Sequence, residues 1–150
     1  MIEAHKVSAW KGRYDIAADG RQVATWDKSA WTSGGTLEID GRRHDVRADL
    51  WRGNWTMTDT TGAVVATATG VGRATWTVEA GRVTHEFRRG SWWRYEVHLL
   101  AAGAAVGSVR RPRLWRADAV ADLPGLPLDV AVFALAVVLA KWENDAAAAG

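Results

Sequence analysis

Arginine side chains gather in the last third of the chain, where they could bind phosphate. Between positions 82 and 116 there are eight arginines but only two acidic residues, Glu86 and Glu96. A guanidinium group binds phosphate oxygens through two parallel hydrogen bonds, so clustered arginines favour an anionic ligand. The alternative is a solvated face with local ion pairs. The candidate anionic-ligand-binding residues are those at expected strand ends or loops: Arg88, Arg89, Arg94, Arg110, Arg111 and Arg113.

Two adjacent tryptophans, Trp92 and Trp93, lie between the Arg88–Arg89 pair and Arg94. Neighbouring strand residues point to opposite faces, so we expect one indole inside the fold and the other outside. An outward indole beside arginines is typical of membrane interfaces, and both are candidate membrane-contact residues. Most of the other tryptophans are expected to fill the core: Trp10, Trp26, Trp31, Trp51, Trp55, Trp76, Trp115 and Trp142.

Other kinds of chemistry find little support in the sequence. The four histidines fall on separate expected strands without a His-x-His or His-x-x-x-His pair, so we expect no metal site. The chain has no cysteine, which excludes a thiolate nucleophile. Ser91 and Ser108 lack a nucleophile-elbow pattern, and Gly70-Val71-Gly72 lacks the third glycine of a dinucleotide fingerprint. We therefore expect no catalytic residue and no cofactor.

The arginines must be positioned by a meander of short strands. From residue 5 to about 119, alternating segments rich in Val, Thr and Trp are separated by glycine turns such as Asp19-Gly20 and Asp40-Gly41. Twelve strands are expected, near 5–10, 13–18, 21–26, 35–40, 42–50, 54–59, 63–69, 73–79, 82–88, 93–100, 104–110 and 113–119.

A helix is expected over about 128–145, after the proline-containing break at 122–127. Its apolar side chains cover every side, which indicates a helix enclosed by protein. Twelve tilted strands close into a barrel roughly 24 Å across, wide enough for a helix about 10–12 Å thick. The expected fold is therefore a single domain, residues 1–150, that is mainly β: a closed antiparallel barrel of about twelve strands around a hydrophobic C-terminal helix.

This layout, with the apolar segment 126–143 at its end, resembles the tubby C-terminal superfamily, and within it the phospholipid-scramblase-like and LURP-one-related small proteins. The resemblance covers nearly the whole chain and rests on layout, not on a sharp motif. It implies the barrel with a central helix, and contact with phosphoinositides or other membrane lipids. The palmitoylated cysteines and the calcium-binding segment of animal scramblases are not recognisable here, which argues against scramblase activity.

The expected function is non-enzymatic binding, at a membrane periphery, of anionic phospholipid or another phosphorylated ligand. The alternative is a protein-interaction scaffold without a lipid role, and an enzyme is the least favoured class. A carrier of small apolar ligands is disfavoured because the helix would occupy the cavity. Nucleic-acid binding is not expected, since the sequence shows no recognition helix or aromatic platform. With no visible signal peptide and an apolar run of 11 residues, too short to span a bilayer, we expect a cytoplasmic protein, peripheral at the inner membrane surface.

Overall fold

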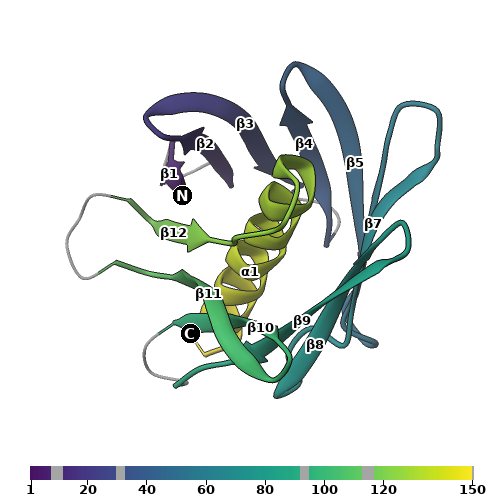
Figure 1. The fold of residues 1–150 in the computed structure, drawn as a ribbon. Helices are drawn as coiled ribbons and strands as arrows, with labels where there is room; N and C mark the ends of the chain where they lie inside the picture. The colour runs from purple at the N-terminus through teal and green to yellow at the C-terminus, as the bar shows by residue number, and fades with distance from the viewer. Residues whose placement is uncertain (8–11, 30–32, 92–94, 113–116, 150) are drawn as a thin grey trace.

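The chain folds as a twelve-stranded antiparallel meander closed into a barrel around one helix (Figure 1). The structure is a computed structural model that describes residues 1–7, 12–29, 33–91, 95–112 and 117–149. The strands are β1 (Ile2–Lys6), β2 (Arg13–Ala18), β3 (Arg21–Lys28), β4 (Gly35–Ile39), β5 (Arg42–Asp49), β6 (Asn54–Thr58), β7 (Val64–Thr69), β8 (Thr75–Ala80), β9 (Val83–Arg89), β10 (Glu96–Ala101), β11 (Ala104–Arg110) and β12 (Ala119–Asp122).

Closure of the barrel joins the two ends of the sheet. β1 pairs with β12 in antiparallel register, with Ile2 opposite Ala121 and Ala4 opposite Ala119. Each remaining strand pairs with its neighbours in sequence. Closure leaves no unpaired sheet edge, which is how all-β proteins avoid edge-to-edge association. The predicted fold class is confirmed.

The helix α1 (Leu128–Ala149) passes through the barrel, as Figure 1 shows in yellow. Every residue from Val130 to Ala140 is buried, as the all-round apolar pattern predicted. The helix lies closest to β3, β4, β7 and β12. The residues of β7 and β12 that belong to the buried core cluster are small: Ala66, Ala68, Ala119 and Ala121. Small side chains allow the backbones to approach closely.

Several element bounds differ from those predicted. β1 begins at Ile2 instead of residue 5, and β12 occupies Ala119–Asp122 where a strand was predicted over 113–119. Residues 8–11 and 113–116, which those predictions included, lie outside the described part of the chain. The helix continues to Ala149, beyond the predicted end near 145, because the alanines of the tail are the strongest helix formers.

Successive turns of the meander alternate between the two ends of the barrel. We call the end where α1 begins the amino rim; its strands are joined by 19–20, 40–41, 59–63, 81–82 and 102–103, and 123–127 leads into the helix. We call the end where α1 finishes the carboxy rim; its strands are joined by 7–12, 29–34, 50–53, 70–74, 90–95 and 111–118. The amino-rim turns are tight: Asp19 and Gly20, with φ of 50° and 82°, form a two-residue hairpin turn in which both residues need positive φ.

Candidate functional site

The connecting segments of the two rims differ sharply in composition. Those of the amino rim contain three acidic residues, one basic residue and no tryptophan. Those of the carboxy rim contain one acidic residue, Asp118, and seven basic residues. The carboxy-rim segments also contain six of the ten tryptophans of the chain: Trp10, Trp31, Trp51, Trp92, Trp93 and Trp115. Of these six, Trp51 lies in the described part of the chain.

The described residues of the carboxy rim expose apolar side chains to solvent. Trp51 is 100% exposed, and its neighbour Leu50 is 51% exposed. Val7, at the start of the segment between β1 and β2, is 53% exposed. The expectation that Trp51 fills the core is therefore wrong: a turn beyond the strand ends cannot direct its side chain into the barrel. Trp26, Trp55, Trp76 and Trp142 are buried as predicted, whereas Trp10, Trp31 and Trp115 lie outside the described residues.

The turn that presents Leu50 and Trp51 is fixed against the neighbouring rim turn. The backbone N–H of Val71 donates to the carbonyl of Gly53 over 2.9 Å, and the Gly70 N–H donates to the Asn54 side chain over 3.4 Å. A Cβ atom on Gly53 would lie 2.5 Å from the Val71 carbonyl oxygen, so only glycine permits this approach. The turn that carries Leu50 and Trp51 is thus held in a defined position next to residues 70–73.

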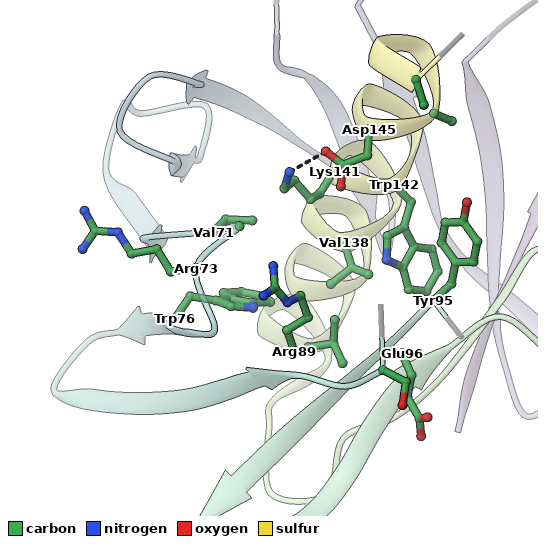
Figure 2. Close-up of a pocket in the computed structure, with 15 residues that line it drawn as sticks. Val71, Arg73, Trp76, Arg89, Tyr95, Glu96, Val138, Lys141, Trp142 and Asp145 are labelled. Carbon is green, nitrogen blue, oxygen red and sulfur yellow. Dashed lines mark hydrogen bonds and ion pairs between the residues drawn. The ribbon is translucent and has the colours of Figure 1, made fainter. Parts of the chain in front are cut away.

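Those same residues form one wall of a cavity between α1 and the barrel (Figure 2). The cavity measures about 350 Å³ and opens at the carboxy rim. Trp76, Val97 and Val138 give it apolar walls, and Arg89 extends from β9 toward the helix, while the Arg73 guanidinium points away from α1. Within the described part of the chain, neither Arg73 nor Arg89 forms an ion pair with a carboxylate.

The acidic residues at the end of α1 are offset by nearby cations. Glu143 lies 3.5 Å from the Nζ atoms of both Lys6 and Lys28. Asp145 accepts a 2.5 Å hydrogen bond from Lys141, one helical turn earlier. The two carboxylates at the end of α1 are thus paired with lysines, whereas Glu96, which also lines the cavity, lies 3.7 Å from His98.

Two of the candidate arginines lie on the outer face of the barrel wall. Arg88 stands opposite Thr75 and His98, and Arg110 stands opposite Glu96 on the other side of β10. Both arginines are exposed. Between them, His98 lies 3.7 Å from Glu96, so the patch that separates the two cations carries a carboxylate. The structure does not join Arg88 and Arg110 into one purely basic patch.

Two other candidate arginines lie on the inner side of the carboxy rim. Arg89 is the sequence neighbour of Arg88, but strand alternation turns it toward the cavity. The guanidinium carbon of Arg111 lies 4.2 Å from the centre of the Tyr95 ring and 5.6 Å from that of Trp142, in cation–π geometry. Arg94, Arg113, Trp92 and Trp93 lie outside the described residues. The described candidates are thus divided between an outer wall and an inner rim.

Sequence reasoning missed Leu50, Trp51, Arg73 and Trp76, because it grouped residues by their distance along the chain. A usable signal was present: in an antiparallel meander, alternate turns meet at the same end of the sheet. Grouping every second turn collects the tryptophans and basic residues at one end.

The histidines fall on separate strands, β1, β5, β9 and β10. Burial lowers the pKa of His85. No group of three or more His, Asp or Glu side chains suited to a metal ion occurs among the residues that the structure describes. In the sequence, the carboxy-rim segments are instead rich in arginine and tryptophan, residue types suited to anions and apolar groups.

Comparisons with known proteins add no further constraint on this site. No family model, curated protein or solved structure matched the chain. The class of protein is therefore defined by the fold itself: a closed twelve-stranded antiparallel barrel with one C-terminal helix. The resemblance to the tubby C-terminal superfamily stays a prediction. Across the described residues, no helix combines the length and the apolar character needed to cross a bilayer.

Proposed function

We propose that this protein is a non-enzymatic module that binds peripherally to membranes containing anionic phospholipid, through its carboxy rim. The observation that carries this proposal is the difference between the two rims. The connecting segments at one barrel end contain seven basic residues in the sequence, of which Arg52, Arg73 and Arg111 lie in the described part of the chain, together with the exposed side chains of Leu50 and Trp51. The segments at the other end have an excess of acidic residues. Charge of this polarity orients the carboxy rim toward an anionic surface before contact.

The turn with Leu50 and Trp51 supplies the apolar part of the contact. An indole that is 100% exposed gains free energy when it moves from water into the headgroup region, where tryptophan is enriched in membrane proteins. Its anchored backbone means that little conformational entropy is lost on insertion. Arg52, directly after Trp51, is 80% exposed; its Nε lies 3.8 Å from the exposed Asp49 carboxylate, and it can exchange this partner for headgroup phosphates.

The electrostatic part comes from the basic side chains of the same rim. Each lysine or arginine close to an anionic leaflet contributes about 1 kcal/mol. The cytoplasmic leaflet carries the anionic lipids that such a rim requires, so we place the proposed contact at the inner membrane surface. Tight phosphoinositide recognition would add specific phosphate contacts to this attraction.

Vesicle co-sedimentation tests the proposal. Wild-type protein should pellet with phosphatidylcholine vesicles that contain phosphatidylglycerol or a phosphoinositide, and not with pure phosphatidylcholine. Trp51→Ala and Arg52→Glu should each weaken partitioning by about tenfold, from lost apolar burial and from reversed charge respectively. The matched controls Val64→Ala and Arg82→Glu, which alter exposed residues at the amino-rim end, should leave it unchanged.

Two outcomes overturn the proposal. The first is equal pelleting with neutral and anionic vesicles, and the second is an equal loss of binding in the Arg82→Glu control. If no vesicle is bound but Trp51→Ala abolishes capture of a defined protein partner, the rim is a protein-interaction surface, because exposed tryptophan and arginine also dominate protein interfaces.

A further inference from the structure

A cavity separates α1 from the barrel wall at the carboxy rim. The helix does not fill the space toward β8, β9 and β10 there, although it lies close to β3, β4, β7 and β12. On the opposite side, hydrogen bonds from Tyr14 to Glu143 and from Lys28 to Asn144 hold the helix against β2 and β3. The cavity is thus a product of how the fold positions its helix.

The size of this cavity exceeds that of a packing defect. Protein interiors are close-packed, and the voids that remain seldom exceed the volume of a water molecule. A volume of about 350 Å³ corresponds to roughly a dozen water molecules at about 30 Å³ each, and it falls within the range of small-molecule sites.

The chemistry of the walls defines one class of ligand. Trp76, 4% exposed and stacked on Phe87 with ring centroids 4.5 Å apart, forms a rigid apolar wall on the barrel side. Val138 faces it from the helix, and Arg89 places its guanidinium group at the side of the cavity (Figure 2). Among the described residues, Arg89 forms no ion pair with a carboxylate.

Lys141, Asp145 and Glu96 also line the cavity, but Lys141 is paired with Asp145, and Glu96 lies 3.7 Å from His98. A site with apolar walls and a guanidinium donor suits a molecule with one anionic end and one apolar end.

We infer that this cavity is a binding site for a single-chain anionic amphiphile, with its phosphate or carboxylate group on Arg89 and its alkyl chain between Trp76 and Val138. The volume fits a chain of roughly ten carbons, since a methylene group is about as large as a water molecule. Such a ligand is distinct from the bilayer surface, so the inference does not depend on the proposed function. A lysophospholipid and a free fatty acid share this chemistry.

Titration with soluble amphiphiles, below their micellar concentrations and without vesicles, tests the inference. Decyl phosphate should bind at a ratio of one to one, with a change in tryptophan fluorescence and a heat signal in calorimetry. Decanol and inorganic phosphate should each bind at least tenfold more weakly, because decanol lacks the anionic group and inorganic phosphate lacks the alkyl chain. Decanoate and decylphosphocholine distinguish a carboxylate ligand from a phosphodiester headgroup.

Arg89→Gln should weaken decyl phosphate binding by about ten- to a hundredfold, the usual effect of losing a charge-assisted hydrogen bond. Its matched control is Arg88→Gln, the neighbouring residue on the outer face of β9, which should bind as the wild type does. Trp51→Ala should also leave this affinity unchanged, which separates the cavity from the proposed membrane contact.

A second variant, Val138→Phe, should fill the cavity and abolish binding of both decyl phosphate and decanol. Circular dichroism and thermal unfolding of Val138→Phe report whether the barrel stays folded. If this variant does not fold, Arg89→Gln, which changes an exposed residue, tests the inference. The inference is overturned if Arg88→Gln and Arg89→Gln have equal effects, if decanol binds as tightly as decyl phosphate, or if decyl phosphate shows no saturable binding.

Discussion

Tyr14 in β2 donates its phenolic hydrogen to Oε1 of Glu143 in α1, over 2.5 Å and across 129 residues of sequence. The tyrosine is 5% exposed, and Glu143 lies within 3.5 Å of both Lys6 and Lys28. This bond ties the end of the helix to the first strands of the barrel. The cavity lies between α1 and other strands, β8, β9 and β10.

We expect Tyr14→Phe to lower the free energy of unfolding by about 1–2 kcal/mol, because a buried hydrogen bond to a charged acceptor is lost. Burial raises the pKa of the Tyr14 hydroxyl well above its usual value near 10, and the hydrogen bond to Glu143 raises it further. Because the folded state holds this proton more tightly than the unfolded state, the Tyr14 hydroxyl stabilises the fold fully below about pH 10. This stabilisation decreases as the pH rises above that value. Urea unfolding from pH 7 to pH 11 should show the difference between wild type and Tyr14→Phe shrinking above about pH 10. A constant difference contradicts this assignment.

The central helix is predicted to dominate stability. Phe133 and Leu135 are 0% exposed and lie in the middle of the buried segment of α1. Phe133→Ala should destabilise the protein by about 3–5 kcal/mol, because it removes an aromatic ring and leaves a cavity. Chemical denaturation measures this loss. Ala147→Ser, in the exposed helix tail, is the control and should change stability by less than about 0.5 kcal/mol.

The fold could be predicted from the sequence because its determinants are local. Turns such as Asp19-Gly20 give the strand number, and the apolar stretch 130–140 has no polar face that could meet water. The site could not be predicted in the same way. Arg88 and Arg89 are neighbours in sequence, yet they lie on opposite faces of the barrel wall. Arg73 and Arg89 line one cavity because the start of β8, just after Arg73, pairs with the end of β9, where Arg89 lies. This pairing cannot be read from the sequence.

The cavity beside the helix could also not be predicted from the sequence. As expected, the helix is buried along Val130–Ala140. It does not fill the whole interior, however, because a cavity lies beside Val138 and Trp142 at the carboxy rim. Whether an internal helix is centred depends on the sizes of the side chains around the wall. Alanines on β7 and β12 and larger residues on β8 and β9 make this wall uneven.

Gly53 should be essential for the position of the exposed turn that carries Leu50 and Trp51. Its φ is +68°, and an added Cβ would lie 2.5 Å from the Val71 carbonyl oxygen. Gly62, at the amino rim, has a φ of +84° with nothing within 4 Å of an added Cβ. Gly62→Ala should therefore cost about 1 kcal/mol from backbone strain alone, and Gly53→Ala at least about 2 kcal/mol. Gly53→Ala should also weaken vesicle binding, since it displaces Trp51. Equal effects of the two variants on stability and binding would show that the contact with Val71 is unimportant.

The two parts of the proposed membrane contact should respond differently to salt. Ions screen charges beyond about 10 Å at 0.1 M ionic strength and about 3 Å at 1 M, but they do not weaken the transfer of an indole from water. At low salt, Trp51→Ala and Arg52→Glu should both reduce partitioning into phosphatidylglycerol-containing vesicles. As sodium chloride approaches 1 M, the effect of Arg52→Glu on partitioning should disappear. Trp51→Ala should still reduce the partition coefficient by the same factor, although the partition coefficient of the wild type is itself smaller. Vesicle titration followed by tryptophan fluorescence measures both variants across the salt series. If the two effects vanish together, Trp51 acts by orienting the basic side chains and not by entering the bilayer.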